Sequence, residues 1–93
     1  MRTIYKYTLQ EIDEQEIKIH GLVDAKFKDQ VLKVESQNDI PCIWVMVDTD
    51  LPEELRHFST RGTGHMCSGV HADDYLGTYQ LYNGDLIFHV FGY

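Results

Sequence analysis

The segment YLGTYQLYNGDLIFHVF, residues 75–91, decides the fold because it reads as two strands joined by a tight turn. The strands Tyr75–Tyr82 and Asp85–Phe91 flank Asn83-Gly84, the pair that two-residue type I′ hairpin turns prefer. This turn fixes which residues lie opposite each other: Tyr82 and Asp85, Leu81 and Leu86, Tyr79 and Phe88, and Gly77 and Val90.

Residues that lie opposite each other share a face of a sheet, so this hairpin has two distinct faces. The apolar face, which we expect to be core, consists of Tyr79, Leu81, Leu86, Phe88 and Val90. The more polar face consists of Thr78, Gln80, Ile87 and His89.

The rest of the chain shows the same pattern of short strands and turns. Alternating residues predict strands over Arg2–Leu9, Glu16–His20, Lys26–Glu35, Ile40–Asp48 and Leu55–Arg61. The phase of the third strand slips, which a bulge near Asp29-Gln30 would absorb. Turn-forming residues fill Gln37-Asn38-Asp39, and Val70–Tyr75 allows one helical turn. We therefore predict a single mainly β domain over residues 1–93: a small antiparallel sheet, partly closed barrel or sandwich of six to seven strands with at most one short helical turn.

The most apolar of these strands, Ile40–Asp48, is hydrophobic on both faces. Such a strand is either central in a two-layered fold or covered by another subunit. The second alternative predicts a homo-oligomer. Its candidate interface residues are Ile43, Val45 and Val47.

Charge and hydropathy exclude several kinds of protein. The net charge of −7 argues against a nucleic-acid-binding surface, which needs clustered Lys and Arg. No apolar run approaches the ~20 residues that cross a bilayer, and the first residues lack the apolar stretch of a signal peptide. We therefore expect a cytoplasmic protein that binds neither nucleic acid nor membrane. The densest acidic stretch is a solvated turn or a contact for a basic partner; it contains Glu11, Asp13, Glu14 and Glu16.

The stretch Arg61-Gly62-Thr63-Gly64-His65 divides the chain by charge, because all 8 Lys and Arg residues lie at or before Arg61. Its glycines either form a tight turn or free backbone N–H groups to cradle a phosphate beside the Arg61 guanidinium. A lone Gly-x-Gly lacks the lysine of a P-loop and the longer dinucleotide fingerprint. The candidate ligand-binding residues are Arg61, Thr63 and His65, together with Thr78 and His89 from the polar face of the hairpin.

The loop after this stretch contains residue types that bind zinc or form a thiol centre. His65, Cys67 and His71 are candidate metal ligands, although their spacing matches none of the standard zinc patterns. Cys67 with either histidine also offers a nucleophile and a base. Alternatively, these residues simply lie in an exposed loop and bind nothing. We expect neither a bound metal nor a cofactor. Cys42, within an apolar strand, is expected to be a buried free thiol.

Several short motifs occur in an order that resembles a family of small proteins of unknown function encoded by bacteriophages and prophages. They are MRTIYKY at residues 1–7, PCIW at 41–44, GTGH at 62–65, YLGTYQ at 75–80 and FHVF at 88–91. The resemblance implies a phage-type accessory protein that acts in the bacterial cytoplasm, and it transfers no catalytic residue. The sequence departs from the family pattern at Met66-Cys67 and in the longer Gly21–Asp29 segment.

These observations favour a non-catalytic, homo-oligomeric binding protein that a phage uses against a host component. The partner would be a host protein that it inhibits, as in anti-defence, or a signalling nucleotide that it sequesters. One alternative is a small metal- or thiol-dependent enzyme that uses the His65–His71 loop. Another is a protein whose acidic surface blocks a basic host protein.

Overall fold

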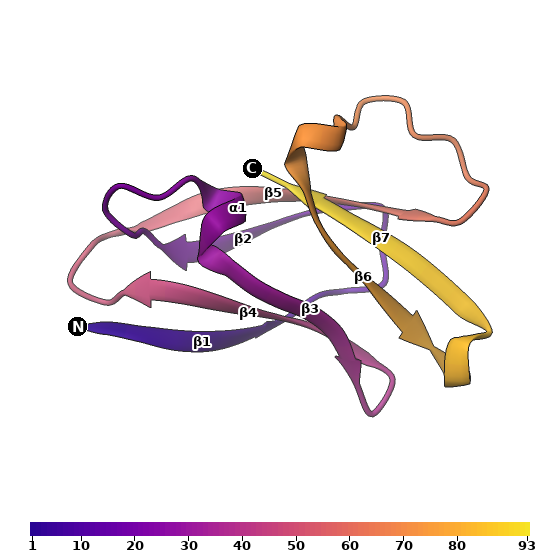
Figure 1. Ribbon diagram of the computed structural model, residues 1–93, viewed down its shortest axis with the longest axis horizontal. Coiled ribbons are helices and arrows are strands. Elements are labelled where there is room, and N and C mark those ends of the chain that lie inside the picture. The colour runs from indigo at the N-terminus through magenta and orange to yellow at the C-terminus, as the bar shows by residue number, and fades with distance from the viewer.

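A computed structural model describes the whole chain, residues 1–93, as two packed antiparallel sheets (Figure 1). The elements, in chain order, are β1 (Arg2–Thr8), β2 (Glu14–His20), α1 (Phe27–Gln30), β3 (Val31–Gln37), β4 (Ile40–Asp48), β5 (Glu53–Gly62), the 3-10 turn η1 (Ala72–Asp74), β6 (Tyr75–Leu81), the 3-10 turn η2 (Tyr82–Gly84) and β7 (Leu86–Gly92). The prediction of a mainly β fold is confirmed. None of the helices is long and apolar enough to cross a bilayer.

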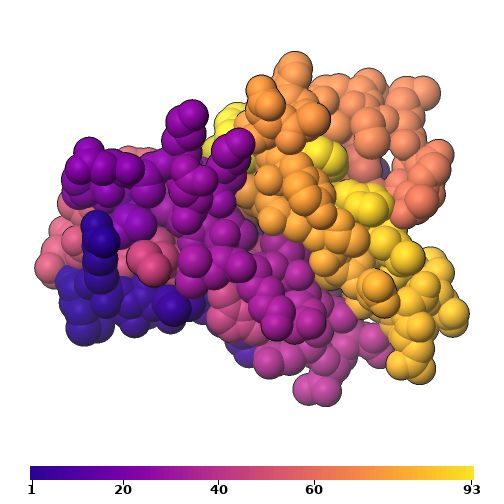
Figure 2. All heavy atoms as spheres, in the orientation of Figure 1, coloured from indigo at the N-terminus to yellow at the C-terminus, as the bar shows by residue number.

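The strands are ordered β1-β4-β3 in the smaller sheet and β2-β5-β7-β6 in the larger one. Strands β3 and β6 lie side by side at the centre of Figure 1, although they belong to different sheets. Their side chains are in contact in the space-filling view of the same face (Figure 2). The Ser36 hydroxyl also donates to the Gln80 carbonyl across this boundary. The result is a sandwich that is partly closed at one edge.

The core lies between the two sheets. It consists of Leu9, Ile19, Phe27, Ile43, Val45, Val47, Phe58, Tyr79, Leu81 and Val90. Ile43, Val45 and Val47 are each 0% exposed, because β4 is the central strand of its sheet and turns this face inward. The prediction that these three residues form a subunit interface is therefore wrong. The alternative of a strand that is central in a two-layered fold is correct. Cys42 is a buried free thiol, as expected.

The third strand begins later than the sequence predicted. Residues Phe27–Gln30 form the helical turn α1, and strand β3 starts at Val31. Both Phe27 and Gln30 are buried, because residues three apart lie on the same side of a helical turn. The Gln30 amide donates to the carbonyls of His20, at 3.3 Å, and Met46, at 3.1 Å. The break in the alternation of the predicted third strand therefore marks the helical turn α1. The bulge lies between Val31 and Lys33 rather than near Asp29-Gln30.

The register of the terminal hairpin is confirmed from Gly77, opposite Val90, to Leu81, opposite Leu86. Asn83 and Gly84 have the positive φ values, 58° and 90°, that the predicted turn requires. Tyr82 and Asp85 also face each other, since the Asp85 N–H donates to the Tyr82 carbonyl at 3.2 Å, but both residues lie outside the strands to which the sequence assigned them. Tyr82 also has positive φ, and its N–H donates to the Asp39 carboxylate at 2.9 Å.

The apolar face of this hairpin is buried at Tyr79, Leu81 and Val90, as predicted. Leu86 is 43% exposed instead, since it directly follows the turn at the end of the sheet. The turn at Gln37-Asn38-Asp39 is confirmed, with positive φ at Asn38 and Asp39.

Gly77 allows β6 to approach β3 closely. A Cβ atom at this position would lie 2.7 Å from both Cβ and Cγ2 of Val34. Contacts between carbon atoms are optimal near 3.5–4.0 Å, so either the strand or the Val34 side chain would have to move. The absent side chain of Gly77 is therefore a condition for the closed edge of the sandwich.

Substituting Gly77 with alanine tests this condition. We expect Gly77→Ala to lower the free energy of unfolding by about 1–3 kcal/mol, the usual cost of overpacking. Urea denaturation measures the change. Gly21→Ala is the matched control, because its Cβ would meet only Leu51 Cδ1 at 3.8 Å. Equal stability of Gly77→Ala and the wild type would contradict the close approach.

Candidate functional site

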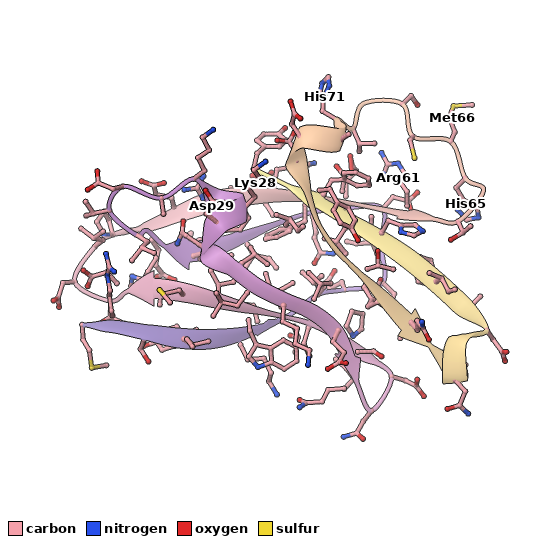
Figure 3. The ribbon with its side chains drawn as sticks, viewed as in Figure 1. Lys28, Asp29, Arg61, His65, Met66 and His71 are labelled. Atoms are coloured by element: carbon pink, nitrogen blue, oxygen red, sulfur yellow. The ribbon has the colours of Figure 1, made fainter.

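The outer face of the larger sheet gathers most of the predicted ligand-binding residues. Arg61 on β5 lies opposite His89 on β7, which lies opposite Thr78 on β6. Thr63 follows β5 directly and hydrogen-bonds to His89. The structure thus brings four of the five residues together, and His65 lies further along the loop (Figure 3).

His89 is the centre of a chain of hydrogen bonds on this face. Its Nε2 lies 2.8 Å from Thr63 Oγ1, and its Nδ1 lies 3.0 Å from Thr78 Oγ1. The Thr78 hydroxyl in turn lies 2.5 Å from the phenol oxygen of Tyr75. Thr63 and Tyr75 stand at the two ends of the long connection between β5 and β6, so His89 ties both ends to the sheet. Tyr75 is not among the ligand-binding residues that the sequence predicted, since a register shift between Tyr75 and Gly77 moves it out of simple alternation.

The guanidinium of Arg61 is occupied by acceptors of the protein itself. Its Nη1 donates to the carbonyls of Asp13, at 3.2 Å, and Thr60, at 3.1 Å. The same nitrogen contacts Glu14 Oε2 at 3.4 Å, and Nη2 donates to the Ser68 carbonyl at 3.4 Å. The side chain is only 15% exposed. Arg61 therefore fastens neighbouring segments to β5.

Glu14 joins this network from β2. Its Oε1 accepts a hydrogen bond from Ser59 at 2.9 Å and lies 3.5 Å from His57 Nε2. Partial burial alone would raise the pKa of Glu14, but the hydrogen bonds from Ser59, Arg61 and His57 outweigh it and lower the pKa below its usual value. The carboxylate therefore supports the fold above its unfolded pKa and loses that effect as the pH falls through its folded pKa.

The Gly62–His65 segment forms a tight turn rather than an open cradle. The Thr63 N–H donates to the Ile87 carbonyl at 3.2 Å, and the His65 N–H donates to the Gly62 carbonyl at 3.0 Å. The His65 ring lies over Gly62, where a Cβ would meet it at 2.9 Å. The N–H groups of Thr63 and His65 are therefore already hydrogen-bonded within the protein and are not free to bind a phosphate.

The candidate metal ligands do not come together. His65 and His71 lie at separate ends of the loop in Figure 3. No group of three or more His, Cys, Asp or Glu side chains is placed to hold a metal ion. The thiol of Cys67 is exposed and contacts the backbone carbonyl of His65 at 3.8 Å, rather than its imidazole ring.

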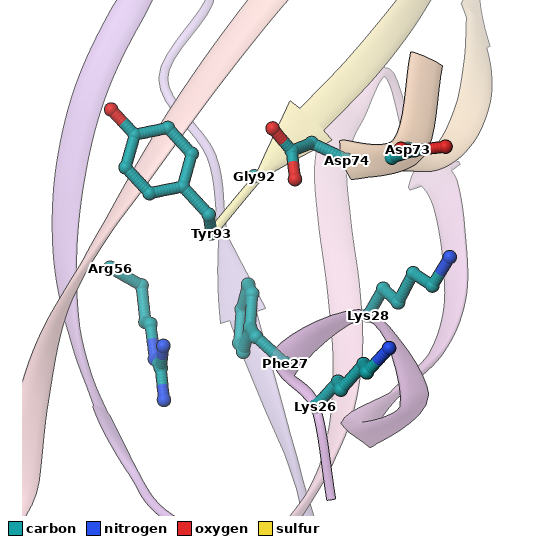
Figure 4. Close-up of a pocket in the computed structure, with 8 residues that line it drawn as sticks. All are labelled: Lys26, Phe27, Lys28, Arg56, Asp73, Asp74, Gly92 and Tyr93. Atoms are coloured by element: carbon teal, nitrogen blue, oxygen red, sulfur yellow. The ribbon is translucent and has the colours of Figure 1, made fainter. Parts of the chain in front are cut away.

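A hollow of about 490 Å³ lies where α1 faces η1 and the end of β7 (Figure 4). It is lined by Lys26, Phe27, Lys28, Arg56, Asp73, Asp74, Gly92 and Tyr93. None of these residues is among the site residues that the sequence predicted, and they come from four separate segments of the chain. The one local signal was a pair of lysines on either side of Phe27.

Aromatic and cationic groups are fixed in this hollow. The Phe27 ring packs edge-on against Phe58, with 5.6 Å between ring centroids. The Arg56 guanidinium lies 4.9 Å from the Phe27 centroid and pairs with Glu54 at 3.0 Å. Lys26 and Lys28 are exposed and form no salt bridge within 4.0 Å. The floor of the hollow is therefore the buried Phe27 ring under the Arg56 guanidinium, beside two ammonium groups without a carboxylate partner.

The hydrogen bonds of His89 to Thr63 and Thr78 lead to a prediction about the connection between β5 and β6. Replacing His89 with alanine removes its hydrogen bonds to Thr63 and Thr78, each worth about 0.5–1.5 kcal/mol. The free energy of local opening of segment 63–74 should fall by about 1–2 kcal/mol. The amide protons of this segment should therefore exchange roughly five- to thirtyfold faster.

Amide hydrogen exchange at Thr63, His65 and Asp74, whose N–H groups are hydrogen-bonded, measures this opening. The control is His71→Ala, because the exposed His71 ring makes no hydrogen bond. Unchanged exchange rates in His89→Ala would show that the hydrogen bonds of His89 do not hold the connection between β5 and β6 in place.

Comparison with curated proteins and with solved structures gives no match. A family model does match, and it covers residues 1–93. The chain therefore belongs to the family described as Domain of unknown function (DUF7352).

Proposed function

We propose that this is a phage-type accessory protein that acts without catalysis in the cytoplasm of a bacterial host. Its host component would be a phosphate-bearing nucleotide, which the protein sequesters in the hollow between α1 and η1. One observation carries the proposal: three of the 8 cationic side chains, against two of the 15 acidic ones, line one hollow of a chain whose net charge is −7. The cations are Lys26, Lys28 and Arg56, and the acids are Asp73 and Asp74.

Charge supports an anionic ligand. A concave surface lined by cations concentrates their field and attracts anions. Lys26 and Lys28 have no carboxylate partner, so they keep their donors for a ligand. Arg56 is held in place by Glu54 and the Phe27 ring. The predicted ligand residue Arg61, by contrast, is already bonded to four protein acceptors.

Shape and aromatic character support a nucleotide in particular. Pockets for small ligands usually measure about 300–1,000 Å³ and combine apolar walls with a few polar groups. The volume of the hollow, about 490 Å³, falls in this range, and five of its eight lining residues are charged, which suits a polar, phosphate-bearing ligand. The Phe27 ring is buried beneath the Arg56 guanidinium, but Tyr93 is 63% exposed at the hollow, and exposed aromatic rings stack on nucleobases.

The side chains that a catalytic role would use do not come together as a nucleophile and its base. Both ring nitrogens of His89 are hydrogen-bonded to threonine hydroxyls, and Cys67 contacts no imidazole. Sequestration requires only affinity. The phage-type motif pattern of the sequence supports the same accessory role.

The proposed homo-oligomer now depends on another surface. Ile4 is 52% exposed on the outer face of the smaller sheet, beside the half-buried Met46 and Trp44. A second copy covering this face would bury them. Light scattering that gives the mass of one chain would remove this part of the proposal.

Isothermal titration calorimetry with a panel of mononucleotides, cyclic dinucleotides and ADP-ribose tests nucleotide binding. We expect at least one to bind, and the double variant Lys26→Ala/Lys28→Ala to weaken it at least about tenfold, because two charge-assisted contacts are lost. Lys18→Ala/Lys33→Ala is the control, since it removes the same charge outside the hollow.

Arg61→Ala should bind as the wild type does if the variant remains folded. Two results would overturn the proposal. One is the absence of heat from every nucleotide; the other is affinity that the Lys26→Ala/Lys28→Ala variant retains in full.

A further inference from the structure

The hollow also carries acidic groups, which an anion site alone does not explain. Asp73 and Asp74, both in η1, line it together with Lys26, which precedes α1, and Lys28, within α1 (Figure 4). Neither carboxylate forms a salt bridge within 4.0 Å. A carboxylate repels a phosphate, so a ligand that fits both walls must offer hydrogen-bond donors to η1 and negative charge to α1.

Asp74 is the better placed of the two. Its side chain is half-buried while that of Asp73 is exposed, and in Figure 4 its carboxylate points across the hollow on the side of Tyr93. The backbone of η1 is fixed, because the Asp74 N–H donates to the His71 carbonyl at 3.0 Å. The next residue, Tyr75, is tied to His89 through Thr78. The backbone that carries the Asp74 carboxylate is therefore anchored to the sheet before any ligand arrives.

The chemistry of a carboxylate selects among the nucleobases. An ionised carboxylate only accepts hydrogen bonds, and its two oxygens accept most strongly from two neighbouring N–H groups. Guanine presents such a pair, N1–H and the N2 amino group, on one edge. Adenine and cytosine place an acceptor nitrogen next to their amino group, and uracil has one N–H between two carbonyls. An acceptor that faces the carboxylate leaves both unpaired, which costs affinity.

We infer that the ligand of the hollow is a guanine nucleotide. Its phosphate lies against Lys26 and Lys28, its base lies near the exposed Tyr93 ring, and Asp74 accepts from N1–H and the N2 amino group. This inference rests on the proposed function, because it specifies the ligand of the same hollow. It adds the recognition of N–H donors by Asp74 to the binding of phosphate by Lys26 and Lys28.

Calorimetry with GMP, IMP and AMP tests the inference. IMP lacks the N2 amino group but keeps N1–H, and AMP lacks both donors. We expect GMP to bind at least about tenfold more tightly than AMP, with IMP between them, because hydrogen bonds to charged groups are worth about 1.5–3 kcal/mol.

Asp74→Asn should weaken GMP binding about tenfold and abolish the preference over AMP. Asp85→Asn is the matched control, because it removes the same charge from a residue outside the hollow. Circular dichroism checks that both variants fold.

Two outcomes would overturn the guanine assignment and leave nucleotide binding intact. One is equal affinity for GMP and AMP that is lost in Lys26→Ala/Lys28→Ala. The other is an Asp74→Asn variant that binds both nucleotides more tightly, which would mean that this carboxylate only repels phosphate. Absence of binding for all three nucleotides and for the wider panel would overturn the proposed function as well.

Discussion

The packing of β4 against the larger sheet is the contact on which the rest of the structure depends. Ile43, Val45 and Val47 on β4, and Phe58 and Val90 across from them, are all 0% exposed. Burying side chains of this size is worth about 1.5–3 kcal/mol each, so this layer provides a large part of the stability of a small domain. This packing fixes the distance between the two sheets. That distance in turn determines where α1 and η1 lie relative to each other.

The hollow follows from this core. Phe27 belongs both to the core cluster and to the lining of the hollow, so burying its ring positions α1 and the two lysines on either side. The opposite wall depends on the larger sheet, where His89 ties down both ends of the connection that carries η1. A cationic wall and an acidic wall from distant parts of the chain thus face each other across an aromatic floor.

Local chemistry made part of the fold predictable. The Asn83-Gly84 pair sets the hairpin register, and alternation identifies the buried face at Tyr79, Leu81 and Val90. The errors come from long-range contacts. The Asp39 carboxylate, 43 residues away, captures the N–H of Tyr82, and Gln30 turns inward to the carbonyls of His20 and Met46. Four of the predicted polar residues do cluster, but their polar groups are used within the protein, and the hollow assembles only when distant segments pack.

Amide chemical-shift mapping by NMR during a titration with GMP tests the central claim most directly, because it reports where on the molecule a ligand binds. The largest shifts should lie in α1, around Lys26 and Lys28, and in η1, around Asp74, with small changes at the Gly62–His65 turn. Shifts concentrated at that turn and at Arg61, with α1 and η1 unchanged, would contradict the account.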